Sequence, residues 1–446
     1  MSMSRKDTEQ QSALWIAATE VAASPGHPFY QRLNRILKDA GFDAFVEALC
    51  ASFYKAGGRP SIAPGVYFRM LLIGYLEGLD SERGIAWRCA DSLGLREFLG
   101  YALTQATPDH SSLSVIRRRL DVEAHSEVFR WVLRVLAEAG LLKGKTIGVD
   151  ATTLEANAAL RSIVRRDTGE SYQAFLMRLA KASGIETPQR EDLAKLDRKR
   201  PKKGSNKEWT HPHDPDARIT KMKDGRTHLA HKAEHAVDLD TGAVLAVTVH
   251  PADQGDTQTL PDTLLQTIEN VKDLPDALPP MQELVADKGY HSNETVSALA
   301  ECHVRSYLSE PKRGRRRWGD QETARQAVYA NRRRIRGVRG RRLLRRRGEL
   351  LERPFAHCYE TGAMRRTHLR GHENILKRLL VHVAACNLGL VMRRRFGFGT
   401  PRGLSELLSS LLASIFPMCH GWGSRWTAIR TPVHSSTVSP RLLAAA

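Results

Sequence analysis

Residues 147–150 (IGVD) and 283–287 (ELVAD) are two short apolar segments that each end on a carboxylate. Runs of this length and composition are typical of strands buried in a sheet. A carboxylate that follows such a run is expected to be partly buried, and burial without a partner is costly. In α/β sheets, ligands bind at strand ends. The sequence therefore predicts a sheet that holds Asp150 and Asp287 at the ends of two strands, beside a binding site.

A local role is the alternative for each aspartate. Asp150 could close an Asx-type turn with Thr152 or Thr153, and Asp287 could do the same before the Lys-Gly dipeptide that follows it. Two acids in equivalent places favour a shared site over two separate turns, but both interpretations stay open from the residues alone.

A third acid follows on a helix-like segment, residues 349–353 (ELLER). Glu352 and Glu349 lie three residues apart on the same helical face, so spacing does not decide between them. Acids delivered from three separated elements suit a hard divalent cation, which binds oxygen ligands. Histidines at 211–213 and 228–235 lack the spacing of a zinc site and are interpreted as hydrogen-bonded or exposed side chains that bind no metal.

Composition indicates a polyanionic partner. The chain has 446 residues, 41% of them hydrophobic, with 68 Lys and Arg against 49 Asp and Glu and a formal net charge of +19. Nucleic acid or an anionic membrane would satisfy this balance. Membrane is disfavoured, because no run approaches the ~18 consecutive apolar residues of a spanning helix and the chain opens on no signal-peptide pattern. The six scattered cysteines predict reduced, mostly buried thiols in a cytosolic protein.

The basic charge is concentrated between the second and third acids. Residues 311–347 contain 16 Lys or Arg and only two acids. Such a run is commonly a solvated surface, yet here it borders the predicted site, and its arginines suit bidentate phosphate binding. We therefore expect it to contact a phosphate backbone.

Helical patterns fill the first ~135 residues. We expect helices over residues 64–76, 80–89 and 107–120, the last carrying Arg117, Arg118 and Arg119. This order is compatible with a helix-turn-helix reader of DNA. A helical bundle with a basic face is the alternative.

An α/β pattern follows. Residues 155–226 are polar and predict a partly mobile insertion. Strands are expected at 228–238 and 243–249 around a tight turn, a helix at 257–271, a helix from Ser292 and a strand at 304–308. A basic linker would then lead to a helical region at 343–392. The predicted fold is α/β with a mixed sheet flanked by helices, divided into an N-terminal helical domain (1–135), a catalytic domain (136–395) and a C-terminal tail (396–446).

Several motifs together resemble the DDE transposases of bacterial insertion sequences, over roughly residues 45 to 400. The most specific is residues 286–290 (ADKGY), which resembles the motif of the second catalytic aspartate. The remaining motifs are residues 59–64 (RPSIAP), 108–114 (PDHSSLS), 117–120 (RRRL), 148–153 (GVDATT), 351–357 (LERPFAH), 362–366 (GAMRR) and 386–388 (CNL). The resemblance implies a ribonuclease H-like catalytic core preceded by a helical domain, as in the insertion-sequence four/five type.

The resemblance also implies roles for individual residues. Asp150, Asp287 and Glu352 become the catalytic, metal-binding triad, with Glu352 preferred over Glu349 because it matches a Glu-Arg-x-Phe pattern. The DNA-contacting residues are expected to be Arg117, Arg118, Arg119, Lys288, Arg345, Arg347 and Arg353.

Relatives carry a Tyr, Arg, Glu, Lys series around the glutamate, and this chain departs from it. Counting from Glu352, Arg345 stands at the tyrosine position, Gly348 at the arginine position and Tyr359 at the lysine position. Arg347, one residue away from the arginine position, is the candidate to substitute for the missing arginine.

The implied activity is transposition. The protein would bind the terminal inverted repeats of its element as a homodimer, cleave double-stranded DNA there and transfer the 3′ ends to a target, in the bacterial cytoplasm on the nucleoid. Two Mg²⁺ ions (or Mn²⁺) about 4 Å apart would activate the attacking oxygen and stabilise the leaving one. The alternatives are a non-enzymatic DNA-binding product of a decayed element and a ribonuclease H-like nuclease without strand transfer.

Overall fold

The computed structural model describes residues 26–406 and 409, apart from 56, 58–60, 201–203, 223–224, 275–277, 313 and 315–317. Arg59, Cys419, most of the predicted tail and the densest part of the basic run lie outside the described residues. Of the cysteines that the structure describes, all five are free, and Cys50, Cys89 and Cys358 are buried, which agrees with reduced thiols.

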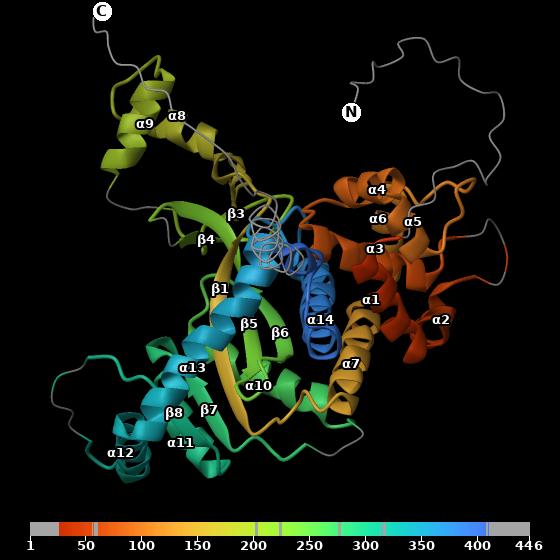
Figure 1. The fold of residues 1–446 in the computed structure, drawn as a ribbon. Coiled ribbons are helices and arrows are strands. Elements are labelled where there is room, and N and C mark those ends of the chain that lie inside the picture. The colour runs from red at the N-terminus through yellow and green to blue at the C-terminus, as the bar shows by residue number, and fades with distance from the viewer. Residues whose placement is uncertain are drawn as a thin grey trace, which may run out of the picture.

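Helices make up the N-terminal part of the described chain (Figure 1). The predicted helices at 64–76, 80–89 and 107–120 are confirmed as α3, α4 and α6. The elements are α1 (Pro28–Asp39), α2 (Phe42–Cys50), the 3₁₀ turn η1 (Ala51–Phe53), α3 (Pro64–Glu77), α4 (Glu82–Asp91), α5 (Leu93–Leu99), α6 (His110–Arg119) and α7 (Val122–Glu138). Ser81, Asp109 and Asp121 cap α4, α6 and α7 through their side chains, which satisfies backbone N–H groups at each helix start. Nearly all of α3 is buried, so it is the central helix of this region.

A mixed sheet follows, as the strand pattern predicted. Its strands run in the order β4-β5-β1-β7-β8, with β6 also paired to β5. They are β1 (Thr146–Glu155), β4 (Arg218–Lys221), β5 (Thr227–Asp238), β6 (Val244–Pro251), β7 (Glu283–Ala286) and β8 (Arg305–Leu308). β1, β5 and β6 are antiparallel neighbours, whereas β1, β7 and β8 are parallel. The predicted hairpin is confirmed at β5–β6, where Gly242 adopts the left-handed conformation that the turn requires (φ +81°).

Helices cover both faces of this sheet. They are α10 (Asp256–Val271), α11 (Asn293–Glu301), α12 (Glu322–Arg336), α13 (Val338–Phe355) and α14 (His372–Phe396), with a 3₁₀ turn η3 (Lys288–Tyr290) and a π-helical turn η4 (Ala356–Thr361). The sequence predicted a basic linker before residue 343, and this is wrong: α12 and α13 make most of that stretch helical.

Gly148 explains how α13 reaches β1. A Cβ at Gly148 would lie 2.6 Å from Leu239 Cδ2 and 2.9 Å from Leu351 Cδ1. The absence of a side chain at this position therefore lets α13 pack directly over the strand that carries Asp150.

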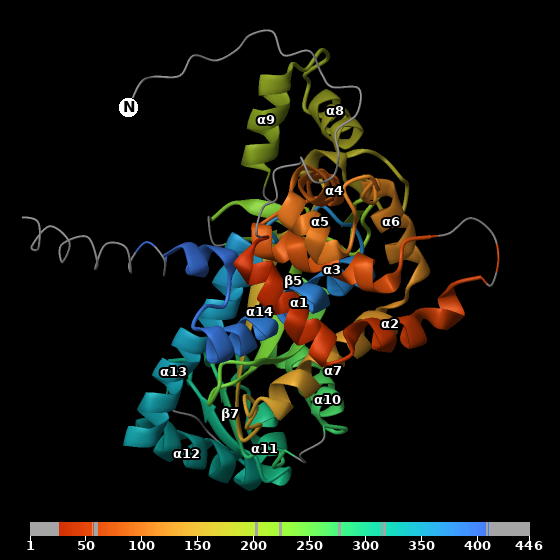
Figure 2. The ribbon, with the colours of Figure 1, turned by 45° about the vertical axis from the view of Figure 1, so that its right-hand side comes forward.

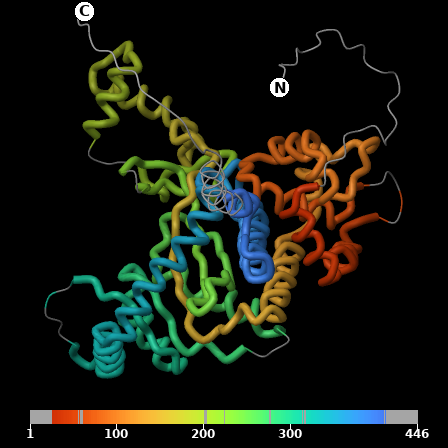
Figure 3. The backbone as a smooth tube through the Cα atoms, in the orientation of Figure 1, coloured from red at the N-terminus to blue at the C-terminus, as the bar shows by residue number. Residues whose placement is uncertain are grey.

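Most of the described part of residues 155–226 forms a small arm that projects from the body (Figure 3), whereas residues 218–221 belong to the main sheet as β4. Its elements are η2 (Leu160–Ser162), β2 (Val164–Arg165), α8 (Tyr172–Ala182), α9 (Arg190–Lys199) and β3 (Trp209–Thr210), followed by β4. Trp209 and Ile163 belong to a separate hydrophobic cluster at its base. The segment that the sequence predicted to be a polar insertion thus contains secondary structure of its own.

The helix α14 joins the helical region to the sheet. It packs against α7 and α3 on one side and against β6 on the other (Figures 1 and 2), within one hydrophobic core that includes both regions. The stretch from His372 to Glu406 is long and apolar enough to cross a membrane, but 78% of its most apolar window is buried inside the protein. Burial on all sides accounts for its composition, because a helix in a core is apolar all round.

Candidate functional site

Asp150 and Asp287 lie at matching positions on neighbouring parallel strands. β1 pairs with β7 as far as Gly148 and Val285, and continuing this register by two residues places Asp150 opposite Asp287. Adjacent strands are about 4.8 Å apart, so the two carboxylates share one edge of the β1–β7 pair. The strand register thus places the two acids next to each other, as the sequence predicted.

One detail of the sequence prediction is wrong. β7 ends at Ala286, immediately before Asp287, but β1 continues beyond Asp150 to Glu155. The reason is that β1 remains paired with β5 on its other side, up to Glu155 opposite Ala230. Asp150 is therefore within its strand, at the point where the parallel partner stops.

Each aspartate also has a local contact. Asp287 caps η3, accepting a hydrogen bond from the Gly289 N–H at 2.7 Å, so the predicted turn role is real and coexists with the shared location. Asp150 accepts a hydrogen bond at 2.9 Å from the N–H of Ala151, the residue before the predicted turn partners Thr152 and Thr153.

Arg347 forms an ion pair with Asp150. Arg347 Nη2 lies 2.6 Å from Asp150 Oδ2, and the two side chains are 14% and 27% exposed. Arg347 comes from α13, close to Leu351, which is buried against the sheet. The positive charge of Arg347 therefore lies next to the Asp150 carboxylate, where the two opposite charges attract each other.

The glutamates of α13 differ in their relation to the sheet. Leu351 faces the sheet; at 3.6 residues per turn, Glu352 lies about 100° around the helix from it and Glu349 about 200°. Both are exposed, and Glu349 forms an ion pair with Arg353 one turn later. Glu352 is thus closer around the helix to the face that packs on the sheet than Glu349 is.

The donor set suits a hard cation, although the acids do not converge in this structure. Among the described residues, no group of three His, Cys, Asp or Glu could hold a metal ion. The chemistry nevertheless fits Mg²⁺, which is bound through one or two carboxylates and keeps several waters. The Arg347 guanidinium on Asp150 acts as a stand-in cation and shows that this carboxylate can accept positive charge.

The structure adds His235 to the site, which sequence reasoning treated only as one of several histidines. His235 faces Asp150 across the β1–β5 ladder, and its Nε2 lies 2.6 Å from the hydroxyl of Tyr359. Burial lowers the pKa of His235 to about 3, so the ring is neutral. Tyr359, at the position where relatives carry lysine, is itself buried and supports the core.

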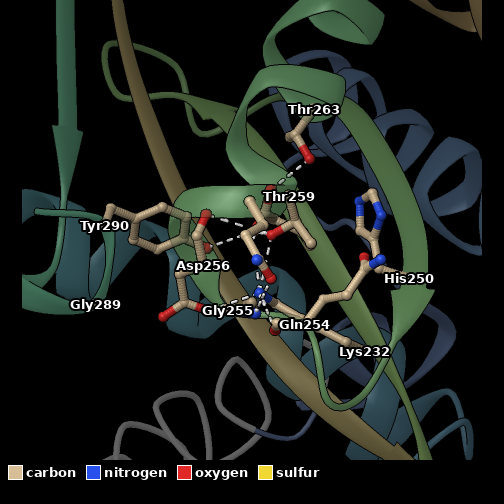
Figure 4. A network of polar contacts seen from close by, with 12 residues as sticks. Lys232, His250, Gln254, Gly255, Asp256, Thr259, Thr263, Gly289 and Tyr290 are labelled. Atoms are coloured by element: carbon tan, nitrogen blue, oxygen red, sulfur yellow. Dashed lines mark hydrogen bonds and ion pairs between the residues drawn. The ribbon is translucent and has the colours of Figure 1, made fainter. Parts of the chain in front are cut away.

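A second missed feature lies beside the Asp287 turn. Lys232, Glu234, Asp256 and Tyr290 are joined by hydrogen bonds and ion pairs. Figure 4 labels Lys232, Asp256 and Tyr290 in this network. The sequence signal was available, because Lys232 and Glu234 are charged residues in the interior of a strand whose other interior residues, 228–237, are apolar or histidine.

The predicted DNA-contacting residues fall into two groups. Arg117 and Arg347 are only 15% and 14% exposed and pair with Glu82 and Asp150. The others are exposed: Arg118, Arg119, Lys288, Arg345 and Arg353. Arg119 also lies over the Tyr54 ring, 5.1 Å from its centre.

Part of the basic run is structural. Arg332 pairs with Glu310, Arg334 donates to the backbone and hydroxyl of Ser306, and Arg339 pairs with buried Glu283. These bonds attach α12 and α13 to the sheet. Among the described residues of this run, the exposed arginines that remain available for phosphate are Arg333, Arg336, Arg341, Arg342 and Arg345.

Paired strand acids below a basic helix, in a chain of net charge +19, define the class of protein: an enzyme that acts on nucleic acid. Comparison with protein families agrees. Residues 19–119 match a family described as Transposase domain (DUF772), and residues 183–388 match a family described as Transposase DDE domain. The two matches identify a transposase with a DDE domain, consistent with the insertion-sequence four/five type, and its mixed sheet is the ribonuclease H-like fold that this domain implies. No curated protein and no solved structure matches it. The DDE match contains Asp287 and Glu352 and begins after Asp150.

Proposed function

We propose that this transposase binds the terminal inverted repeats of its own element, cleaves there and transfers the 3′ ends to target DNA, with Asp150, Asp287 and Glu352 as its metal-binding triad. The observation that carries this proposal is the β1–β7 register, which aligns Asp150 with Asp287. Further support comes from the basic helix α13, which carries Glu352 and packs against both β1 and β7. Transposition uses these three groups without a covalent protein nucleophile.

The chain's own residues supply negative charge and DNA contacts. Bound Mg²⁺, or Mn²⁺ in its place, would supply activation of the attacking oxygen and charge stabilisation at the leaving oxygen. The triad would hold the cations, and Arg347 would leave Asp150 as they bind. Its guanidinium would then be free to contact a phosphate beside the site, which bidentate donors suit. Lys288, Arg345 and Arg353 would hold the DNA backbone nearby.

Sequence recognition is assigned to the N-terminal helices. We keep the division into a DNA-binding region (1–135), a catalytic region (136–395) and a tail (396–446). Arg118 and Arg119 are exposed at the end of α6, and a helix of this kind can enter the major groove. Transposition of two ends implies a homodimer on double-stranded DNA, in the cytoplasm on the nucleoid.

The decisive experiment uses purified protein and the DNA that flanks its gene. Short inverted repeats should bracket the gene within a target duplication. With Mg²⁺, the protein should cleave at these repeats and yield joined products with a target plasmid. Cleavage without joining would identify a nuclease, and metal-independent binding without cleavage would identify a non-enzymatic DNA-binding protein.

A further inference from the structure

Glu234 is a fully buried carboxylate surrounded by donors. It accepts hydrogen bonds from Thr259 Oγ1 at 2.9 Å, from Tyr290 Oη at 2.7 Å and from Thr263 Oγ1. Lys232 Nζ lies 3.8 Å from the same carboxylate. Burial raises the pKa of Glu234, and the hydroxyl donors and Lys232 oppose that rise. A buried carboxylate with this many partners fixes the elements that supply them.

The partners of Glu234 come from two elements of the site. Thr259 and Thr263 belong to α10, and Tyr290 ends η3, the turn that Asp287 caps. Neighbouring strand residues point to opposite faces, so Glu234 faces α10 while His235 faces Tyr359. The network therefore supports the Asp287 turn from the sheet face opposite α13.

Lys232 connects this network to a further acid, Asp256. Lys232 Nζ donates to Asp256 Oδ1 at 2.6 Å and to Thr259 Oγ1 at 2.9 Å. Lys232 is 5% exposed and Asp256 33% exposed. Asp256 is the first residue of α10, and Figure 4 shows it between Lys232 and the Gly289–Tyr290 segment.

Gly289 shows how closely Asp256 approaches the Asp287 turn. A Cβ on Gly289 would overlap Asp256 Oδ2 and would lie 3.0 Å from Asp287 Oδ1. The backbone φ of Gly289 is not positive, so close approach, and not backbone conformation, is the reason for glycine here. One oxygen of Asp256 is thus held by Lys232 while the other lies against the backbone next to Asp287.

We propose that Asp256, held by Lys232, is a positioning residue that fixes the turn carrying Asp287 and thereby sets how tightly the site binds a divalent cation. This inference rests on the proposed function, in which Asp287 is a metal ligand. Groups that orient a metal ligand commonly affect metal affinity about 10- to 100-fold. Asp256 acts through the turn and need not touch the metal or DNA.

The test measures Mn²⁺ binding to the full-length protein without DNA by titration calorimetry, together with the Mn²⁺ dependence of cleavage. Asp256→Ala should weaken Mn²⁺ binding about tenfold or more, and saturating Mn²⁺ should restore most of the cleavage rate. Asp256→Asn, which keeps an oxygen acceptor for Lys232, should recover part of the affinity. Glu269→Gln is the matched control, because it breaks an exposed pair with Lys272 at the far end of the same helix.

A double-mutant cycle separates positioning from general destabilisation. Gly289→Ala should weaken Mn²⁺ binding in the wild-type background, because the added methyl group meets Asp256. In the Asp256→Ala background its effect should be smaller, because only the contact with Asp287 Oδ1 at 3.0 Å then remains and variants that share a contact are not additive.

The outcomes are distinguishable. Asp256→Ala with wild-type Mn²⁺ affinity, whatever its melting temperature, overturns this inference and leaves the proposed function intact. The proposed function is overturned, and this inference with it, if the wild-type protein does not cleave DNA and the Asp287→Asn variant binds Mn²⁺ as tightly as the wild type.

Discussion

At the scale of single residues, Asp150 lies between two sequence-distant partners with different charge states. His235 faces it across the ladder and is neutral, because burial lowers its pKa to about 3. Arg347 is charged and lies 2.6 Å away. Positive charge at the first acid is therefore supplied by α13, which also carries Glu352.

The first prediction concerns the triad. Asp150→Asn, Asp287→Asn and Glu352→Gln should each reduce metal-dependent cleavage below detection while DNA affinity stays near wild type, because each removes a metal-binding charge and keeps the size of the side chain. Cleavage of terminal-repeat DNA and a mobility-shift assay provide the two measurements. Glu349→Gln should remain active; an inactive Glu349→Gln with an active Glu352→Gln would assign the third acid to Glu349.

The second prediction concerns Arg347. Arg347→Met should strengthen Mn²⁺ binding several-fold, because it removes a cation that competes at Asp150, and should weaken binding of cleaved ends. Calorimetry with Mn²⁺ and filter binding with DNA measure the two effects. Arg346→Met is the control, since Arg346 bonds the β5–β6 turn through Asp240 O at 3.1 Å. Unchanged Mn²⁺ affinity in Arg347→Met would show that the ion pair does not compete with metal.

At the scale of elements, α6 carries three consecutive arginines with unequal roles. Arg117 pairs with Glu82, and Ser114 bonds the same carboxylate, so this side of α6 is attached to α4. Arg118 and Arg119 lie on the exposed side of α6. Helical periodicity separates them, because adjacent residues lie about 100° apart around the axis.

The third prediction follows from this division. Arg118→Ala and Arg119→Ala should lower DNA affinity and reduce the slope of log K against log salt by roughly 0.9 per lost phosphate contact. Arg117→Ala should instead lower the melting temperature, because it leaves half-buried Glu82 without its cation. Fluorescence anisotropy over a salt series and thermal unfolding distinguish the two. Equal salt slopes for all three variants would contradict the separation of roles.

At the scale of the whole molecule, the helical region and the sheet share one hydrophobic core around α14. The predicted boundary at residue 135 falls within α7, which packs against α14. Deleting residues 1–135 would therefore expose the buried face of α14, so point variants test recognition more cleanly than truncation.

The fourth prediction is a loss of stability in mild acid. The folded-state pKa of His235 is about 3, below the ordinary value of about 6.5, so the unfolded chain binds more protons below pH 6.5. The stability is present at pH 7 and is lost as pH falls towards 3. This one residue should lower the free energy of unfolding by about 2 kcal/mol at pH 5. His125, whose pKa burial lowers to about 4, acts in the same direction.

Urea unfolding at pH 7 and pH 5 measures this effect. His235→Asn should reduce the difference between the two pH values, whereas His303→Asn, at an exposed position, should leave it unchanged. An undiminished difference in His235→Asn would assign the acid sensitivity to other groups.

The sequence by itself determined most of the helices and strands outside residues 155–226 and 311–342, together with the hairpin turn and the acids that follow apolar runs, because burial periodicity and turn chemistry are local properties of the chain. The motifs around Asp287 and Glu352 also indicated the family from sequence alone. Only the tertiary structure decided the alignment of Asp150 with Asp287, the Arg347–Asp150 ion pair, the attachment of Arg117 to α4 and the approach of Asp256 to Gly289. Each of these depends on how elements distant in sequence pack together, and local patterns carry no information about that packing.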